Sequence, residues 1–299
     1  MMGLLDTTGK IILKRKKEIS DYTVEDVIET IFSESETLLK QAQNESGFNG
    51  DLCAVGVSIP GLADPERGIW VYSPFSKISD FNIREVLEKK FKCPVYIEND
   101  GNICVLGEKR FGIAKNENDF IWITVSNGIG SGLFLDGKLY PGASGNAGEI
   151  GHFKVVDNGD PCPCGGKGCL ETYGAAPGIV RRYKKLAGEQ KNITALEISE
   201  LARGRDRNAL KVFEEEGFFL GKGIAAAVNI LNVPLVVIGG GVSGSFDLFE
   251  PSMKQAIRDF IFYEANKNLR VVKTALGYEA SLISAGACAL YGMEHSQAG

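Results

Sequence analysis

The sequence has no excess of positive charge and no long apolar run, and each shortage argues against a class of protein. Lys and Arg number 33 against 38 Asp and Glu, so the formal net charge is -5. Domains that bind nucleic acid are usually strongly basic, and we expect no nucleic-acid contact by this chain itself. No stretch of about 18 apolar residues occurs, so we expect no membrane span. The start, MMGLLDTTGKIILKRKK, lacks the apolar core of a signal peptide, which predicts a cytoplasmic protein.

Length and composition predict two ordinary globular domains. The chain has 299 residues, of which 44% are hydrophobic and 24% charged, enough to bury a sizeable core. Segments of strand character alternate with segments of helical period, which favours an α/β fold. The chain changes character after Gly112, where it becomes rich in Gly-containing turns. We therefore expect a small N-terminal domain at 1–112, completed by the C-terminal helix 280–293, and a large domain at 113–279.

Individual elements follow from apolar periodicity and from turn residues. The pattern predicts strands at 2–6, 10–19, 52–59, 94–98, 120–126 and 131–140, and a buried strand running into a Gly-rich turn at 235–243. It predicts helices at 23–43, 82–91, 101–111, 175–187, 207–230, 247–265 and 281–292. Thr23 and Asp26 resemble a capping box for the first helix.

A metal-type cluster is the sharpest signal in the sequence. Three of the 7 cysteines lie together as Cys162, Cys164 and Cys169, and His152, one of only 2 histidines, stands ten residues before the first. Three thiolates and one imidazole suit tetrahedral zinc and form a closed, structural site. Ordinary loop cysteines, or a disulfide with a spare thiol, are the alternative. The remaining cysteines are predicted to be free core thiols: Cys53, Cys93, Cys104 and Cys288.

Polar residues at the end of a predicted strand give a second candidate site. Glu98, Asn99 and Asp100 follow the strand at 94–98, and the carboxyl ends of strands in open α/β sheets commonly meet ligands. A carboxylate there can accept a proton from a hydroxyl group. Asn-Asp-Gly is also a good turn sequence, and by local chemistry the turn is the better explanation.

Two Gly-rich turns after strands could bring backbone N–H groups close to phosphate. One contains Gly128, Gly130 and Gly132, and the other is Gly239, Gly240 and Gly241. A strand, not a helix, is predicted after the first turn, so a plain hairpin explains it equally well.

Two carboxylates flank the proposed metal loop. Glu149 precedes His152 by three residues, and Glu171 follows Cys169 by two. Fixed carboxylates of this kind can accept hydrogen bonds from sugar hydroxyls, although either one alone is equally consistent with an exposed surface residue.

Taken together, these motifs resemble the ROK family of bacterial sugar kinases and sugar-responsive repressors. The resemblance runs from Gly3 to about Gly292 and rests on six segments in order: Val57-Ser-Ile-Pro-Gly61, Glu98-Asn-Asp100, Gly128-Ile-Gly-Ser-Gly132, Ala147-Gly-Glu-Ile-Gly-His152, Cys162-x-Cys-Gly-x-x-Gly-Cys-Leu-Glu171 and Ile238-Gly-Gly-Gly-Val-Ser243.

The resemblance implies an actin-like two-domain α/β fold with a sugar in the cleft between the domains, and a homodimer. It implies zinc on the His–Cys cluster, and Asp100 as the catalytic base in a kinase. It implies a sugar site made of Asn99, Asp100, Glu149, His152 and Glu171. His152 would then bind zinc through one ring nitrogen and a sugar hydroxyl through the other.

The sequence departs from the family's kinases in two places. Kinases begin with a strand and an Asp-x-Gly-Gly-Thr phosphate loop, whereas Met2–Asp6 here corresponds to the strand that follows that loop. A missing first strand would leave an unpaired sheet edge. Kinases also usually have Gly-Thr before Gly-Ile-Gly, where this chain has Ser126-Asn127.

These departures favour the sugar-sensing domain of a ROK-type transcriptional regulator, without its DNA-binding domain in this chain. The stretch 64–74 and the turn around Asn127 also look more like the repressor members. Phosphoryl transfer depends on the cradles that neutralise phosphate, so losing one should cripple ATP use. The alternative is an ATP- and Mg²⁺-dependent hexokinase of the glucokinase type, which the complete Glu98-Asn-Asp100 motif and the set of sugar-binding residues allow. The expected ligand is a monosaccharide: a hexose, an N-acetylhexosamine or xylose.

Overall fold

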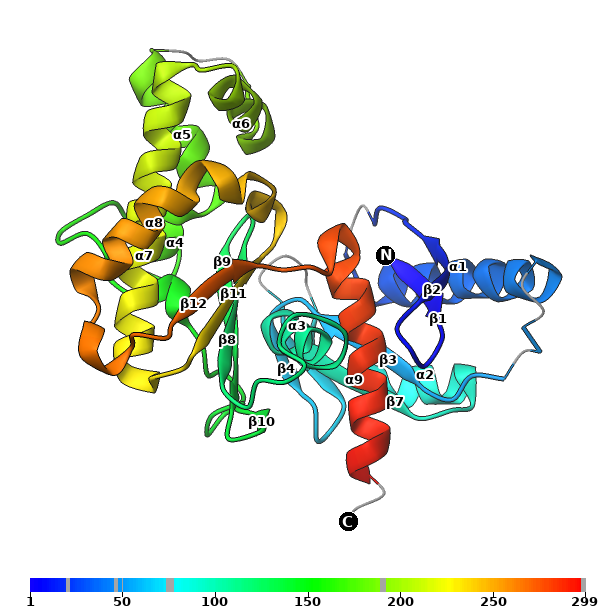
Figure 1. Cartoon of the computed structure of the whole chain (residues 1–299). Coiled ribbons are helices and arrows are strands. Elements are labelled where there is room, and N and C mark those ends of the chain that lie inside the picture. The colour runs from blue at the N-terminus through cyan, green and yellow to red at the C-terminus, as the bar shows by residue number, and fades with distance from the viewer. Residues whose placement is uncertain (20–21, 46–47, 50, 74–77, 189–191, 297–299) are drawn as a thin grey trace. The chain divides into compact units, whose positions relative to one another are not determined.

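The computed structural model describes residues 1–19, 22–45, 48–49, 51–73, 78–188 and 192–296, arranged in two compact units. Unit 1 consists of Met1–Asn116, Pro141–Ala147 and Ala275–Gly299, and unit 2 of Glu117–Tyr140 and Gly148–Thr274. The C-terminal helix therefore belongs to the same unit as the N-terminal strands (Figure 1). No helix in the described part of the chain is long and apolar enough to cross a membrane.

Unit 1 holds three small, separate sheets. Strand β1 (Met2–Leu5) pairs antiparallel with β2 (Ile11–Arg15), and β3 (Val55–Ile59) pairs parallel with β7 (Val95–Asn99). The third sheet is antiparallel and consists of β4 (Leu62–Asp64), β5 (Ile69–Tyr72) and β6 (Ser79–Asn82). The helices of unit 1 are α1 (Val24–Glu45), α2 (Ile83–Phe91), α3 (Asp100–Phe111) and α9 (Ala280–Ser296).

Helix α9 packs closely on strands and helices of unit 1, and glycine makes this possible. A Cβ atom on Gly56 of β3 would lie 1.8 Å from the Ala285 carbonyl oxygen, and one on Gly107 of α3 would lie 1.9 Å from Ser284 Oγ. Both distances are far below any van der Waals contact, so a larger residue at either position would push α9 away. This packing joins the last helix of the chain to β3 and α3.

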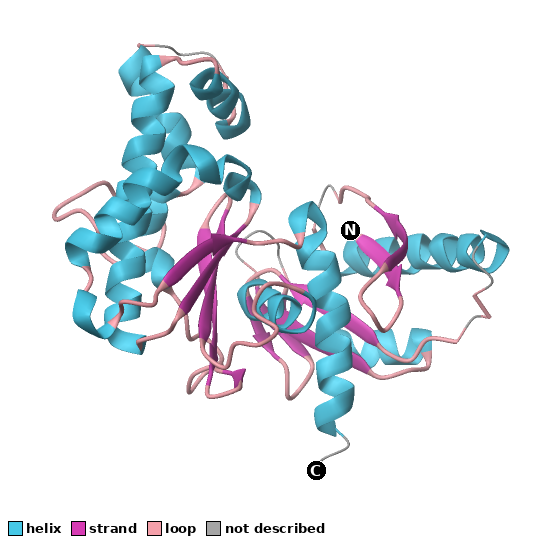
Figure 2. Cartoon of the chain, in the orientation of Figure 1, coloured by secondary structure: helices cyan, strands magenta, loops and turns pink. Residues whose placement is uncertain are grey.

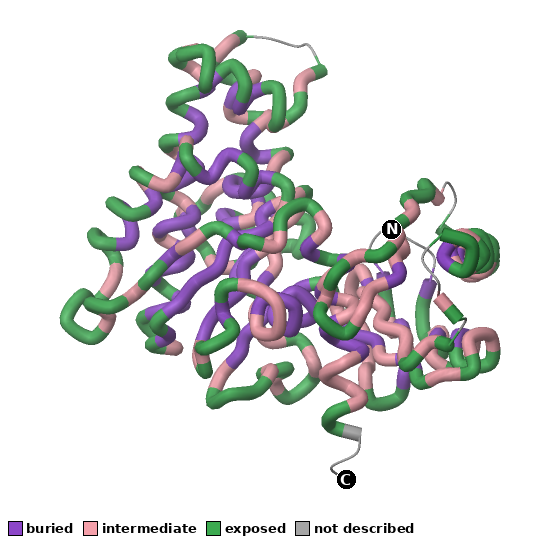
Figure 3. The backbone as a smooth tube through the Cα atoms, turned by 45° about the vertical axis from the view of Figure 1, so that its right-hand side comes forward, coloured by how far each residue is buried: buried purple, intermediate pink, exposed green. Residues whose placement is uncertain are grey.

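Unit 2 is built on one mixed five-stranded sheet in the order β10-β9-β8-β11-β12. The central strand β11 is buried at all five positions and pairs in parallel with both neighbours, as expected for a strand covered on both faces. Figure 2 shows the sheet beside the helical part of the unit, and Figure 3 shows buried residues gathered inside it. The strands are β8 (Phe120–Val125), β9 (Ile129–Leu135), β10 (Lys138–Leu139), β11 (Leu235–Gly239) and β12 (Arg270–Lys273).

Helices α7 and α8 pack against each other along much of their length, and α4, α5 and α6 also contact α7 or one another. The helices of unit 2 are α4 (Leu170–Gly174), α5 (Ala176–Ala187), α6 (Ala195–Arg203), α7 (Arg207–Leu231) and α8 (Phe246–Phe260). Short 3-10 turns cover Ile150–His152, Gly241–Ser245 and Tyr263–Ala265, with another at Gly277–Glu279 in unit 1.

Most predicted elements are confirmed, and the differences have local causes. Helix 247–265 was predicted too long, since α8 ends at Phe260 where Ile261 turns to extended backbone. The prediction at 235–243 is confirmed, since the buried strand ends at Gly239 and runs into a Gly-rich 3-10 turn. At the first helix, the Asp26 N–H donates to Thr23 Oγ1 and the Thr23 hydroxyl donates to the Asp26 carboxylate, which confirms half of the expected capping box.

Several further elements were not predicted. The sheet β4-β5-β6 consists of strands of 3–4 residues, too short for periodicity to show, and β12 is equally short. Helix α6 could have been predicted from the sequence, because Thr194 and Glu197 form a complete capping box at its start.

A buried ion pair ties three helices of unit 2 together. Arg182 of α5 donates to the carboxylate of Glu216 of α7 at 2.7 Å and to the carbonyl oxygen of Tyr173 in α4 at 2.9 Å. The Glu216 side chain is fully buried. Burial raises the pKa of Glu216 to about 8, against the opposing effect of the Arg182 charge. The Arg182 charge thus favours the ionised form of Glu216, whereas burial favours the neutral carboxyl group.

We expect Arg182→Ala to destabilise the protein by about 3–5 kcal/mol, because it leaves a buried carboxyl group without its partner. The double variant Arg182→Met/Glu216→Leu should lose much less, since both polar groups are removed. Urea denaturation followed by circular dichroism measures both. Exposed Arg258→Ala on α8 serves as the control and should stay within about 0.5 kcal/mol of the parent. A single variant as stable as the double variant would contradict the role of the pair.

Candidate functional site

The structure brings the four predicted metal ligands together in unit 2. The ligand atoms of His152, Cys162, Cys164 and Cys169 all lie within 4.8 Å of one another. Cys164 Sγ is 3.7 Å from Cys169 Sγ, and Cys162 Sγ is 3.8 Å from His152 Nδ1. Two thiolates at about 2.3 Å from a tetrahedral zinc ion would lie about 3.8 Å apart. The donor types and their spacing therefore fit a tetrahedral metal ion.

Backbone hydrogen bonds fold the cysteine loop into this shape. The Cys162 N–H donates to the Gly166 carbonyl and the Gly165 N–H donates back to the Cys162 carbonyl, which closes a tight turn around the first two thiols. Gly168 has φ +75°, and a Cβ there would lie 1.8 Å from the Val156 carbonyl oxygen. Glycine is required at that position, just before the third thiol enters the cluster.

The thiols of this cluster differ in the charge their surroundings favour. Burial raises the pKa of Cys169 to about 12, so the neutral thiol is favoured there. A hydrogen bond from the backbone N–H of Gly166 lowers the pKa of Cys164. A bound cation would reverse the first effect, because a metal-coordinated thiol is deprotonated.

Glu171 is attached to the cluster through a short helix. Cys169 is the N-cap residue of α4, and Glu171 lies in the first turn of that helix. The Ile129 N–H, at the start of β9, donates to Glu171 Oε2 at 3.0 Å. In the described part of the chain no donor pairs with Oε1, which can accept from a ligand.

His152 and Glu149 are held on the neighbouring 3-10 turn. Ser131 of β9 donates its hydroxyl to the Gly148 carbonyl, which fixes the backbone just before Glu149. With Nδ1 directed to Cys162, the other ring nitrogen of His152, Nε2, lies 3.7 Å from Glu149 Oε2. The two side chains are 38% and 61% exposed, so this nitrogen and this carboxylate face a ligand-accessible surface.

In unit 1 the three residues of the Glu-Asn-Asp motif have different surroundings. Glu98 is buried and accepts from the Asn99 N–H at 2.9 Å and from Asn102 Nδ2 at 3.1 Å. Burial raises the pKa of Glu98. Asn99 is the N-cap of α3 and accepts from the Asn102 N–H through Oδ1, which leaves its amide group as a donor. Asp100 is exposed in the first turn of α3, where the helix dipole stabilises a carboxylate.

The first Gly-rich turn is a β-hairpin. Strands β8 and β9 pair from Val125↔Ile129 onward, and Gly130 and Gly132 lie within β9 opposite Thr124 and Trp122. A Cβ on Gly128 would lie 2.6 Å from Glu171 Oε2, so glycine here lets the turn approach that carboxylate. The hairpin alternative is confirmed for this turn.

In the second Gly-rich turn, after β11, packing requires glycine at two positions. A Cβ on Gly239 would lie 2.3 Å from the Trp122 ring, and Gly240 has φ +83° with its Cβ position 2.5 Å from the Val125 carbonyl oxygen. Gly241 is exposed and begins the 3-10 turn that leads into α8. Free N–H groups at such a start can bind an anion.

Several supporting residues were not found from the sequence. Asn102 holds Glu98, Ser131 holds the Glu149 turn, and the hydroxyl of Tyr173 accepts from the Asp160 N–H at 2.7 Å beside the cysteine loop. Lys222 of α7 donates to the Val155 carbonyl at 2.7 Å. The partners of Ser131, Tyr173 and Lys222 are distant in sequence, so no local pattern identifies them, whereas Asn102 is only four residues from Glu98.

The other cysteines correct one prediction. Cys104 and Cys288 are buried, but Cys53 is exposed and Cys93 is half-buried. The prediction of core thiols is wrong for these two, because both stand in bends just before β3 and β7.

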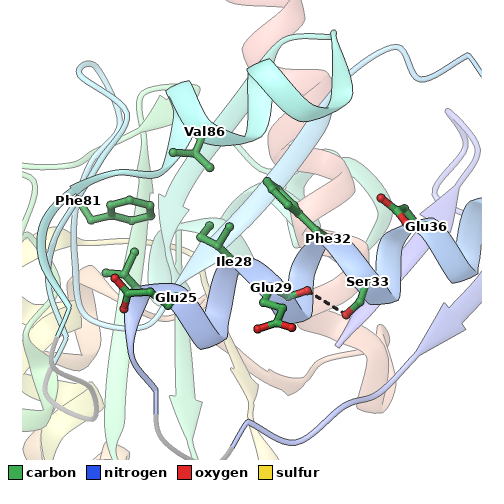
Figure 4. A pocket seen from close by; sticks show the side chains of 9 residues that line it. Glu25, Ile28, Glu29, Phe32, Ser33, Glu36, Phe81 and Val86 are labelled. Carbon is green, nitrogen blue, oxygen red and sulfur yellow. Dashed lines mark hydrogen bonds between the residues drawn. The ribbon is translucent and has the colours of Figure 1, made fainter.

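A shallow groove in unit 1 contains none of the predicted site residues. It encloses about 570 Å³ over α1, β6 and α2. Figure 4 shows Ile28 and Phe32 of α1 near Phe81 and Val86, with Glu25 and Glu29 at the rim. Its apolar floor and lack of converging polar groups do not suit a sugar.

Comparison with known proteins links the chain to both regulators and enzymes. The sequence model of the ROK family matches residues 1–292. The chain is 29% identical over 278 residues to the xylose repressor of Bacillus subtilis, covering 93% of this chain and 70% of the repressor. It is 32% identical over 298 residues to the glucokinase of Thermotoga maritima, covering 95% of this chain and 92% of the enzyme. The chain spans only 59% of a second xylose repressor, that of Bacillus spizizenii.

Two solved structures resemble this one closely. A ROK family transcriptional regulator, a homolog of the Escherichia coli MLC protein, has a TM-score of 0.87 and 26% identity, covering 96% of this chain and 74% of the regulator. A ROK glucokinase from Streptomyces griseus, in complex with glucose and AMPPNP, has a TM-score of 0.83 and 29% identity, covering 97% of this chain and 95% of the enzyme. The predicted actin-like two-domain α/β fold is thereby confirmed.

We expect the purified protein to contain about one zinc ion per chain, held by the His–Cys cluster. Cys169→Ser should lose the metal and melt several degrees lower, since 1 kcal/mol corresponds to about 2–4 °C in a domain of this size. Metal analysis and thermal melting measure these effects. Cys53→Ser, at an exposed thiol outside the cluster, should change neither value. Folded parent protein with almost no zinc would contradict the site.

Proposed function

Because the chain belongs to the ROK family, we propose that it is the zinc-braced, sugar-binding sensor domain of a ROK transcriptional regulator. One observation carries the proposal: Glu171 and His152 are both anchored at the His–Cys cluster while each keeps a free polar atom. Glu171 offers Oε1, and His152 offers Nε2 beside Glu149. Fixed acceptors of this kind suit sugar hydroxyls, because little side-chain freedom is lost on binding.

Unit 1 offers two hydroxyl-binding groups of its own in this proposal. Asn99 would donate its amide N–H to a sugar hydroxyl, since its oxygen caps α3. Asp100, exposed at the start of α3, would accept from another hydroxyl. The names of relatives support a monosaccharide: xylose for one repressor, N-acetylglucosamine for another, and glucose in the Streptomyces griseus enzyme.

Zinc in this proposal has a structural role. His152, Cys162, Cys164 and Cys169 would fill its four positions and leave none for a substrate. The ion would hold the loop before α4 and fix the tautomer of His152, because a metal on Nδ1 leaves the proton on Nε2. His152 would therefore act as a hydrogen-bond donor toward the sugar or toward Glu149.

The first Gly-rich turn favours a sensor over a kinase because it has Ser126-Asn127 where the kinases usually have Gly-Thr. It is a hairpin, and the N–H that follows it donates to Glu171. The turn therefore contributes to the proposed sugar site, and its strand glycines lie within the ladder of β9. DNA binding would belong to another part of the regulator, in keeping with the greater length of the repressor relatives.

A hexose kinase is the second candidate, and it rests on Asp100 and Gly241. An exposed carboxylate at the start of α3 can take the proton from a sugar hydroxyl as that oxygen attacks the terminal phosphate of ATP. The exposed turn at Gly241 could meet phosphate through its N–H groups. ATP and Mg²⁺ would be the cosubstrate and cofactor in this case, as AMPPNP in the Streptomyces griseus glucokinase suggests.

Sugar binding is tested by thermal shift with glucose, N-acetylglucosamine and xylose in the absence of ATP. A ligand at about 100 times its dissociation constant should stabilise the protein by about 2.7 kcal/mol. Glu171→Ala should abolish the shift, because it removes an acceptor fixed by Ile129. The matched control is Glu200→Ala, an exposed glutamate of α6 in the same unit, which should keep the full shift. No shift with any sugar would contradict the site.

The sensor and kinase proposals differ in a coupled assay with ATP, Mg²⁺ and the same sugars. We expect sugar binding without phosphorylation. Turnover at about 1–100 s⁻¹, the usual range of kinases, would contradict the sensor proposal. Asp100→Asn identifies the source of any turnover, because a contaminating kinase would not respond to this change.

A further inference from the structure

Two cysteines outside the metal-type cluster come together in unit 1. Cys53 and Cys93 are far apart in sequence, but Cys53 lies two residues before β3 and Cys93 lies two residues before β7. These strands are side by side and parallel, with Val55 opposite Val95 (Figure 1). Counted back by two residues on each strand, the same register places Cys53 opposite Cys93.

The two backbones are still joined where the thiols are attached. The Val55 N–H donates to the Pro94 carbonyl at 2.9 Å, directly beside the two cysteines. Neighbouring strands lie about 4.8 Å apart. A disulfide needs a Cα separation of about 4.4–6.8 Å, so the spacing of β3 and β7 is compatible with a bond between Cys53 and Cys93.

The two thiols also share one face of the strand pair. Side chains alternate along a strand, so Cys53 lies on the face of Val55 and Cys93 on the face of Val95. Val55 packs against the apolar cluster that contains Val95, so the two faces are the same. The electrostatics agree with this proximity, because burial raises the pKa of Cys93 and the charge of Cys53 raises it further.

The two thiols differ in access to solvent. Cys53 is exposed, whereas Cys93 is half-buried. The nearby carboxylate of Glu88 also raises the pKa of Cys93, which disfavours its thiolate. An exposed thiol can be reached by a small disulfide, and a half-buried thiol beside it is placed to react second. This division is typical of a reactive cysteine with a resolving cysteine.

We propose that Cys53 and Cys93 form a redox-modification site that reacts with low-molecular-weight disulfides of the glutathione type. The Cys53 thiolate attacks one sulfur of the small disulfide, which forms a mixed disulfide and releases the other half as a thiolate. Cys93 then gives its proton to solvent and attacks Cys53 Sγ, which closes the Cys53–Cys93 bond and releases the second half as a thiolate. Two protein thiols are oxidised, and one small disulfide is reduced to two thiols.

The bond would tie together the first residues of β3 and β7. It closes a loop of about 40 residues, and a cross-link of that length restricts the unfolded chain strongly. We expect oxidation to raise the melting temperature by about 5 °C or more. The amide of Val55, whose hydrogen bond lies beside the link, should exchange at least about tenfold more slowly.

The test uses the full chain in buffers of increasing ratio of oxidised to reduced glutathione. Free thiols are alkylated, the protein is digested, and linked peptides are identified by mass spectrometry. Trypsin leaves Cys93 and Cys104 in one peptide, so a second cleavage after Glu98 is needed to separate them. We expect Cys53 and Cys93 to be joined to each other within one chain, whatever occurs at the thiols of the metal-type cluster.

Single variants test the order of the two steps. Cys93→Ser should stop at a mixed disulfide on Cys53, and Cys53→Ser should leave Cys93 unmodified. Neither variant should gain melting temperature on oxidation. Cys104→Ala, at a buried thiol of α3, is the matched control and should keep both the link and the temperature shift.

Three results would each overturn the proposal. The first is the absence of the Cys53–Cys93 link in excess oxidised glutathione. The second is a link from either residue to a different cysteine or to another chain. The third is a rise in melting temperature on oxidation of Cys53→Ser that equals the rise in the parent protein.

Discussion

The closure of the loop 152–169 on itself is the constraint on which the candidate site depends. This loop has little regular structure, yet its four ligand atoms gather within 4.8 Å. Cys169 is both a member of the cluster and the N-cap of α4, so the cluster fixes where that helix starts and where Glu171 points. The hydrogen bond from Ile129 to Glu171 then joins the helix to the central sheet. In the proposed sensor, the metal-type cluster would thus orient the groups that meet the sugar without taking part in chemistry.

The buried Arg182–Glu216 pair also stabilises unit 2. Arg182 also binds the Tyr173 carbonyl, and Tyr173 accepts a hydrogen bond from the loop that carries the thiols. Helix α4 is therefore held at its start by Cys169 and near its end by Arg182. A sugar sensor and a sugar kinase would both benefit from this rigidity, which explains why recognition residues alone do not separate the two functions.

Unit 1 differs from unit 2 in that its described strands are divided among small sheets. Helix α9 spans β1, β3 and α3 through close contacts at glycine, and α1 covers the opposite face. These helices are arranged as the outer layers of a continuous sheet, while β1 and β3 remain edge strands. In the described part of the chain, β1 pairs with β2 alone and β3 with β7 alone, and both strands line one apolar cavity.

The sequence by itself determined the α/β class, the long elements and the metal-type cluster. Apolar periodicity identifies α1, α7 and β11 because these elements are long or fully buried. Four potential metal ligands within 18 residues likewise indicate a metal site without any knowledge of the tertiary structure. Only the tertiary structure decided that Glu98 is a buried support while Asp100 is exposed, although the two are near neighbours in sequence. It also decided that the first Gly-rich turn serves Glu171, and that Ser131 and Arg182 hold the site. The roles of Glu171, Ser131 and Arg182 depend on partners 17 to 42 residues away, and contacts at such separations follow from packing, which no local pattern encodes.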